Sequence, residues 1–209
     1  MIKETSNQNE TKVYYYRDRS ACSFSEPEDL DEDYIKSAKI LHFTGITPVL
    51  SESCKRTVYK AIELAQKNGV SLSFDPNIRY KLWGNHDYSP MIREMMMQSE
   101  IILAGLDEAN LLLGVQNPDD IFKKIFAYGK AQFIALKDGA NGAWVATREE
   151  THKMDPFPCR CIDPIGAGDS FNAAFLAGIL EGRNIKECGT MGAIEMCIRD
   201  SLKTGNGDC

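Results

Sequence analysis

Apolar positions recur along this chain in two different periods, and the two periods alternate. Short runs rich in aromatic and β-branched residues are typical of strands, whereas apolar residues three or four apart are typical of helices. Strands are expected at residues 12–17, 38–44, 70–74, 100–104 and 132–136, with antiparallel edge strands at 143–145 and near 153. Helices are expected between them. This alternation predicts an α/β fold in which helices cover both faces of a mostly parallel sheet.

Residues typical of helix ends refine this outline. Ser51 or Ser53 can cap a helix that Gly69 ends, and Pro118 suits the first position of another. Residues 75–87 are expected to form a polar and aromatic loop. Further helices are expected from 89, at 108–113, at 166–180 and from 185. Ligands of such sheets bind at the carboxyl ends of the strands, so the candidate loops follow Phe74, Ala104, Leu136 and Ile162.

Composition and charge exclude several classes of protein. The 209 residues suffice for one sizeable core, and no apolar run approaches the length of a membrane helix. The N-terminus is polar and lacks a signal-peptide core, which favours the cytoplasm and gives no reason to expect a membrane partner. The net charge of −6 argues against a nucleic-acid partner.

Cysteine and histidine residues do not suggest a metal site. The seven cysteines are scattered, and Cys159 and Cys161 have no second pair nearby that could complete a zinc site. The three histidines lie far apart in the sequence. Reduced structural thiols and structural histidines are therefore expected.

The turn at Gly166-Ala167-Gly168-Asp169 is the strongest candidate for chemistry. Two glycines at the start of an apolar helix can present successive N–H groups to negative charge. A carboxylate beside them can take a proton from a hydroxyl that attacks a phosphoryl group. A glycine-rich helix start with Asp169 as a plain first-turn acid remains open. A dinucleotide fingerprint fits less well, because Phe171 stands where its third glycine belongs, and no Gly-Lys-Ser/Thr follows to make a P-loop.

The run from Asp163 to Phe171 resembles the C-terminal signature of the ribokinase-like (PfkB) carbohydrate kinases, D-T-x-G-A-G-D-x-F. Pro164 in place of Thr is most similar to the 2-keto-3-deoxygluconate kinase branch. The resemblance implies a three-layer αβα sandwich. It also implies Asp169 as general base and the backbone of Gly166, Ala167 and Gly168 as the anion hole.

Other segments resemble the same family in order and spacing. The stretch 14–21 is similar to Y-Y-R-x-G-S-A, which implies sugar-acid binding by Tyr15 and Arg17, with Arg19 in place of the usual Gly. The stretch 75–79 is similar to D-x-N-x-R, which implies Asn77 at the nucleotide phosphates and Arg79 at the substrate carboxylate.

The stretch 137–142 is similar to the nucleotide loop K-x-G-x-x-G, which implies nucleotide binding by Lys137, Gly139 and Gly142, together with Gly166 and Gly168. Glu108 matches the Glu of N-x-x-E, which helps to organise Mg²⁺, but Gly105 stands at the Asn position. A first-turn helix acid is the alternative for Glu108.

The ends of the chain depart from the family pattern. The chain resembles only the latter two-thirds of a family member, so most of the lid over the sugar is expected to be missing. Residues 1–24 are interpreted as a remnant of the lid and sugar-binding strands, 25–195 as an incomplete ribokinase-like core, and 196–209 as an atypical tail.

The resemblance thus implies ATP- and Mg²⁺-dependent phosphorylation of a sugar acid, 2-keto-3-deoxygluconate foremost, at its terminal hydroxyl. Arg17 and Arg79 favour an acid because a guanidinium binds both carboxylate oxygens at once. Three alternatives stay open: a non-catalytic fragment, a kinase of a neutral sugar such as fructose or ribose, and an NAD-binding domain. A homo-oligomer is left open for the full-length protein.

Overall fold

The computed structural model describes residues 2–5, 11–14, 17, 19–158 and 165–201. The chain divides into two compact units. The first comprises Met1–Leu72 and Ile78–Tyr88, and the second comprises Ser73–Asn77 and Ser89–Cys209. The boundary falls within one strand, so the end of that strand belongs to the second unit.

The first unit contains two antiparallel strands and a long amphipathic helix. Its elements are β1 (Ile2–Thr5), β2 (Thr11–Tyr14), η1 (Ala21–Phe24), η2 (Pro27–Asp29), α1 (Glu32–Ser37), β3 (Ile40–Thr44), η3 (Thr47–Val49), α2 (Glu52–Lys67) and α3 (Tyr80–Trp83). Ser51 caps α2, since its hydroxyl accepts the N–H of Cys54 at 3.0 Å. Val58, Ile62 and Ala65 are buried along one face of α2, as the helical spacing predicts.

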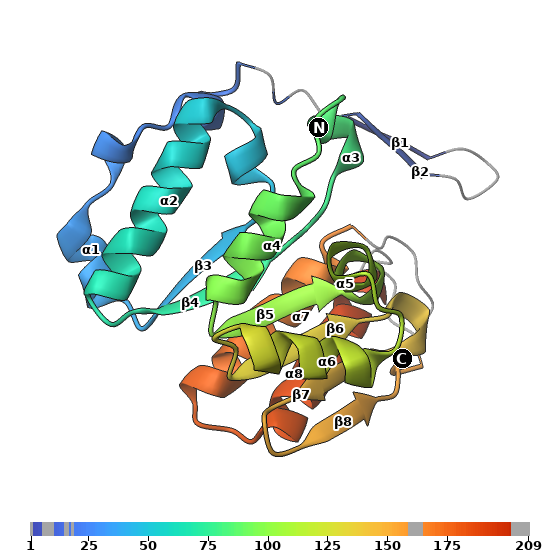
Figure 1. Cartoon of the computed structure of the whole chain (residues 1–209). Helices are drawn as coiled ribbons and strands as arrows, with labels where there is room; N and C mark the ends of the chain where they lie inside the picture. The colour runs from blue at the N-terminus through green and yellow to red at the C-terminus, as the bar shows by residue number, and fades with distance from the viewer. Residues whose placement is uncertain (1, 6–10, 15–16, 18, 159–164, 202–209) are drawn as a thin grey trace. The chain divides into compact units, whose positions relative to one another are not determined.

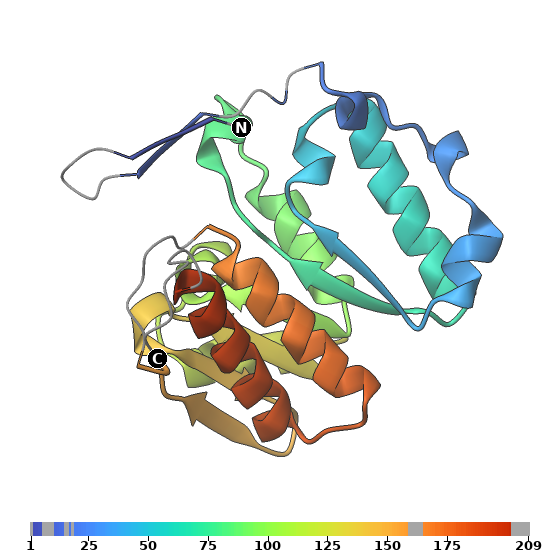
Figure 2. The same ribbon diagram turned by 180° about the vertical axis from the view of Figure 1, so that it is seen from behind.

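The second unit has three layers. Its elements are the part of β4 (Ser71–Asp75) that begins at Ser73, α4 (Ser89–Gln98), β5 (Ile101–Gly105), α5 (Leu106–Leu113), α6 (Pro118–Tyr128), β6 (Phe133–Lys137), η4 (Gly139–Asn141), β7 (Ala143–Ala146), β8 (Thr151–Met154), α7 (Ala167–Leu180) and α8 (Ile185–Ser201). Helices α5 and α6 cover one face of its strands (Figure 1), and α7 and α8 cover the other (Figure 2).

The larger sheet has the strand order β3-β4-β5-β6-β7-β8. Strand β5 runs parallel to both β4 and β6, and Gly105 lies opposite Lys137 in the register. Strand β7 is antiparallel to β6 and to β8. The predicted α/β fold is confirmed. The prediction that β7 is an edge strand is wrong, because it pairs on both sides, and Val145 within it is fully buried.

Besides the short 3-10 helices, two elements were not expected from the sequence. Strand β1 lies in the polar N-terminus and is formed by pairing with β2, with Ile2 opposite Tyr14. Helix α3 lies inside the expected loop at 75–87. It is held by aromatic contacts, because the buried Trp83 ring packs edge-on against Tyr80 and Tyr88, at centroid distances of 5.3 and 5.9 Å.

Close packing of α7 on α8 fixes the start of α7. A Cβ added to Gly192 of α8 would lie 2.8 Å from the Phe171 ring, so this glycine allows the ring to approach the α8 backbone. Phe171 is fully buried and stacks on Phe175 at a centroid distance of 6.0 Å. Asp169 therefore stands two residues before a side chain that has little freedom to move. Among the described residues, no helix is both long and apolar enough to cross a membrane.

Candidate functional site

Three parallel strands of the second unit end on chemically distinctive residues. Strand β4 ends at Asp75, β5 at Gly105 and β6 at Lys137. Because carboxyl ends of parallel strands meet at one edge of a sheet, these residues share the edge at which α/β proteins bind ligands. The candidate ligand loops predicted after these three strands therefore lie in one region of the second unit.

A buried polar triad joins this edge to α7. The Lys137 ammonium donates to Asp75 Oδ2 at 3.0 Å and to Asn172 Oδ1 at 2.9 Å. The Asn172 amide donates to the same Asp75 oxygen at 2.6 Å. The Asp75 and Lys137 side chains are only 5% and 11% exposed. A buried ion pair of this kind is stable only when further hydrogen bonds satisfy its partners, and Asn172 supplies two.

Asn77 lies at the same place through the backbone. Its N–H donates to Asp75 Oδ1 at 3.1 Å, so that Asp75 holds β4, β6, α7 and this loop together. The φ angle of Asn77 is +41°, in the left-handed region that Asn tolerates better than most residues.

Helix α7 begins at the predicted Gly-Ala-Gly-Asp turn. Gly166 is its N-cap residue with φ +86°, a conformation that favours glycine, and it offers no side-chain cap. The first N–H groups of a helix have no acceptor within the helix and carry partial positive charge. A Cβ added to Gly168 would lie 3.7 Å from the Lys137 ammonium. The turn, the lysine and the exposed first-turn Asp169 thus occur together.

An apolar hollow of about 440 Å³ adjoins this turn. Its lining includes both predicted loop glycines, Gly139 and Gly142, and also Gly168 and Phe171. Such a volume and lining suit a flat, mostly apolar group next to an anion site. The structure therefore brings together the residues assigned to the nucleotide by resemblance: Asn77, Lys137, Gly139, Gly142, Gly166 and Gly168.

Glu108 acts as a helix cap in this structure. Its Oε2 accepts the N–H of Gly105 at 2.9 Å, in the manner of a capping box. A Cβ at position 105 would lie 3.2 Å from that oxygen, so the family's Asn would force the Glu108 side chain to shift. Among the described residues, no group of three or more His, Cys, Asp or Glu could hold a metal ion alone.

Of the residues assigned to the sugar, Arg17 and Arg79 belong to the first unit, whereas Asp169 belongs to the second. Arg79 is exposed, precedes α3, and its Nη1 donates to the carbonyl of Ile78 at 3.2 Å. Arg17 is half-buried, and Tyr15 lies outside the described residues, as do Asp163 and Pro164 of the signature. Arg19, which replaces the family's Gly, has φ +55°, a backbone conformation for which glycine is better suited.

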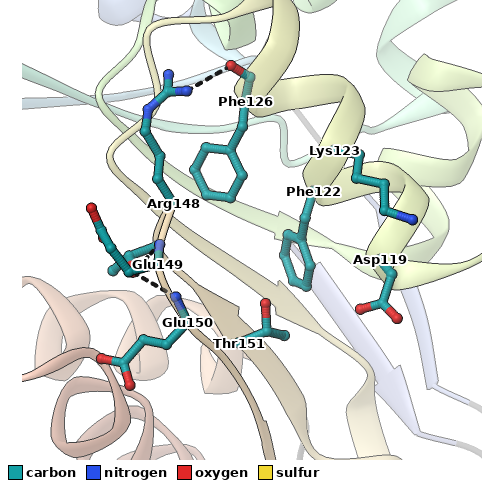
Figure 3. Close-up of a pocket in the computed structure, with 9 residues that line it drawn as sticks. Asp119, Phe122, Lys123, Phe126, Arg148, Glu149, Glu150 and Thr151 are labelled. Atoms are coloured by element: carbon teal, nitrogen blue, oxygen red, sulfur yellow. Dashed lines mark hydrogen bonds between the residues drawn. The ribbon is translucent and has the colours of Figure 1, made fainter.

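A second hollow, of about 400 Å³, lies between α6 and the β7–β8 turn (Figure 3). Two of its cationic side chains already have partners. The Arg148 guanidinium lies 5.3 Å from the Phe126 ring centroid and donates to the Phe126 carbonyl at 2.9 Å, and Lys123 pairs with Asp120. None of the predicted site residues lines this hollow, so it is not the candidate site.

Sequence reasoning missed two members of the site, Asp75 and Asn172. Both gave a signal, because each is a polar residue in an apolar setting. Asp75 ends a buried strand, and Asn172 interrupts the apolar run that begins at Phe171. Of the cysteines, Cys22, Cys54, Cys188 and Cys197 are free thiols, as expected, while Cys159, Cys161 and Cys209 lie outside the described residues.

Comparisons with known proteins identify relatives of this chain. A 2-dehydro-3-deoxygluconokinase of Bacillus subtilis is 32% identical over 191 residues, which cover 90% of this chain and 58% of that protein. A relative from Arabidopsis thaliana named "Probable fructokinase-4" is 30% identical, over 94% of this chain and 59% of its own length. The chain thus spans less than two thirds of these relatives.

The fold is also similar to solved structures. The 2-dehydro-3-deoxygluconokinase of Thermotoga maritima has a TM-score of 0.86 at 24% identity, over 97% of this chain and 67% of that one. Such a likeness supports the ribokinase-like α/β fold. Residues 1–200 match the pfkB family carbohydrate kinase pattern, nearly the whole chain. The chain belongs to the pfkB family of carbohydrate kinases.

Proposed function

We propose that this chain carries the phosphoryl-transfer site of an ATP-dependent sugar-acid kinase that acts on 2-keto-3-deoxygluconate or a close analogue. One observation carries the proposal: the Gly166–Asp169 turn starts α7 beside both a lysine ammonium and an apolar hollow of about 440 Å³. A site for a triphosphate needs an anion hole, a cation and a pocket for the base. All three elements belong to the second unit.

In the proposed reaction the terminal hydroxyl of the sugar attacks the γ-phosphorus of ATP. The new bond joins the sugar oxygen to phosphorus, the bond from phosphorus to the β-phosphate oxygen breaks, and ADP leaves. The Asp169 carboxylate takes the hydroxyl proton. The backbone N–H groups of Gly166, Ala167 and Gly168 hold the phosphoryl oxygens as negative charge develops. Asn77 and Lys137 are proposed to face the nucleotide phosphates.

Magnesium is proposed to enter with ATP, where it would neutralise phosphate charge. Mg²⁺ usually keeps several waters and takes one or two carboxylates together with phosphates. The residues fit this mode, because Glu108 supplies one carboxylate, whose Oε2 also accepts the Gly105 N–H. We propose that Glu108 acts on the ion through water.

The sugar acid is proposed from two arginines and from the relatives' names. Arg17 and Arg79 supply guanidinium groups, which bind carboxylates with two parallel hydrogen bonds. Tyr15 is proposed to contact the sugar hydroxyls. The Bacillus subtilis relative is named for a sugar acid and the Arabidopsis thaliana relative for fructose. Their similar identities of 32% and 30% do not favour one sugar over the other.

A coupled ADP-release assay over a panel of sugars and sugar acids tests the proposal. Turnover should be highest with 2-keto-3-deoxygluconate and low with ribose and fructose. Highest turnover with fructose would replace the substrate assignment with the neutral-sugar alternative.

The cytoplasm is the proposed compartment of this chain, because free thiols stay reduced there.

A non-catalytic fragment is the second candidate, since the chain covers only 58% of the Bacillus subtilis relative. Calorimetry separates the two. A sugar-acid kinase should bind both ATP and the sugar acid, whereas a fragment without its sugar contacts should bind ATP at most. Turnover by the chain alone would reject the fragment.

A further inference from the structure

The buried polar triad of Asp75, Lys137 and Asn172 has a structure that nucleotide contact alone does not explain. Counted over the whole residue, Asp75 and Asn172 are each only 3% exposed, so neither can make extensive contact with a ligand. Both nevertheless bind the Lys137 ammonium, at 3.0 and 2.9 Å. Burying a carboxylate and an amide costs free energy unless each is paired, so their arrangement calls for a reason beyond packing.

The triad limits where the lysine can be. A lysine side chain has four rotatable bonds and normally samples many positions. Here Asp75 Oδ2 and Asn172 Oδ1 fix two of the three N–H directions of the ammonium. Among the described residues, no third acceptor for it is found. The ammonium is held beside Gly168, at the turn that begins α7.

Asn172 ties the triad directly to this turn. It lies in α7, three residues after Asp169, and its amide also donates to Asp75 at 2.6 Å. Asp75 in turn accepts the N–H of Asn77. One carboxylate therefore sets the positions of the lysine, the Asn77 loop and the first turns of α7 relative to one another.

We propose that Asp75 and Asn172 are positioning residues, which hold the Lys137 ammonium in place to receive the terminal phosphates of the nucleotide. The inference rests on the proposed function and deepens it. Asp75 also balances the lysine charge, so the cation can be buried before the nucleotide arrives. Neither residue touches substrate, and each acts through Lys137.

The test compares the dissociation constants of ATP and adenosine, measured by calorimetry with Mg²⁺ present. Asn172→Leu removes both amide contacts without changing the charge. It should weaken ATP binding about 10-fold, the value of one charge-assisted hydrogen bond, and leave adenosine binding within about twofold. Ser99→Ala is the matched control, because Ser99 is fully buried in the same unit and its hydroxyl donates to the Met95 carbonyl at 2.9 Å, away from the triad. It should leave both constants unchanged.

A double-mutant cycle checks that Asn172 acts through the lysine. In an Asp75→Asn/Lys137→Met background, which removes the ion pair without a net charge change, adding Asn172→Leu should leave ATP binding unchanged. If leucine at 172 prevents folding, Asn172→Ala makes the same test with less bulk.

Asn172→Leu or Asn172→Ala with unaltered ATP binding would overturn the inference and leave the triad a purely structural feature. An equal loss of ATP and adenosine binding would do the same, because it would indicate general disruption of the pocket. Failure of the wild-type chain to bind ATP would instead refute the proposed function, and this inference with it.

Discussion

The loop between β6 and β7 contains two glycines that provide a matched test of the structure. Gly142 has φ +91° and ψ −134°, and Gly139 has φ +52°. A Cβ on Gly142 would collide with the Met154 carbonyl oxygen and lie 3.0 Å from the Pro156 nitrogen. A Cβ on Gly139 would meet nothing within 4 Å. Changing each glycine to alanine therefore separates backbone strain from collision.

The two substitutions should differ clearly in free energy of unfolding. Gly139→Ala should cost about 1–2 kcal/mol, the penalty of a left-handed backbone for a residue with a Cβ. Gly142→Ala adds overpacking of about 1–3 kcal/mol to backbone strain of about 1–3 kcal/mol, or roughly 2–6 kcal/mol together. The colliding atoms belong to the backbone, so no side-chain rotation can relieve the contact.

Thermal unfolding of the wild type and both variants measures the difference. For a chain of this size 1 kcal/mol lowers Tm by about 2–4 °C, so the midpoint values predict a fall of roughly 3–6 °C for Gly139→Ala and 8–16 °C for Gly142→Ala. Equal losses, or a larger loss for Gly139→Ala, would refute the described path of this loop against Met154.

Three further predictions concern backbone, thiols and charge. Arg19→Gly should raise the free energy of unfolding by about 1 kcal/mol, because Arg19 has φ +55°, where a residue with a Cβ is strained. Urea denaturation measures the change, and an unchanged free energy of unfolding would contradict the prediction. Burial, followed by the neighbouring Glu187 charge, raises the pKa of the Cys188 thiol, so iodoacetamide at pH 8 should alkylate the exposed Cys22 before Cys188, as peptide mass spectrometry would show. The hydrogen bond from Lys67 lowers the pKa of Glu32. The small contribution of this pair to stability should therefore be present at pH 7 and lost as the pH falls through that lowered pKa. Glu32→Gln should destabilise the chain at pH 7 but not at pH 2, as urea denaturation at both pH values would show.

Local patterns in the sequence were enough to predict most of the fold. Ser51 before an amphipathic segment predicts α2, and two glycines before an apolar run predict α7, because each helix signal lies within a few residues. The local pattern of β7 resembles that of an edge strand. Its interior position is set by pairing with both β6 and β8, which a local pattern does not show. Helix α3 was missed because it is held by ring contacts rather than by periodicity.

The site was predictable where motifs are contiguous and not where contacts span the chain. Lys137 belongs to a glycine-rich loop that the resemblance identifies. Its partners come from 62 residues before it and 35 residues after it. A lysine shows no local preference for such partners, so the triad emerges only when the strand ends and α7 are brought together.

The central claim is that Asp169 takes the proton in phosphoryl transfer at the start of α7. ADP release with 2-keto-3-deoxygluconate, compared between the wild-type chain and Asp169→Asn, tests it most directly. The account predicts that turnover falls at least ~100-fold, the usual contribution of a general base. The dissociation constant of ATP should stay within about threefold, because the substitution keeps the side-chain shape and the backbone N–H groups remain. Turnover near the wild-type value in Asp169→Asn would contradict the account.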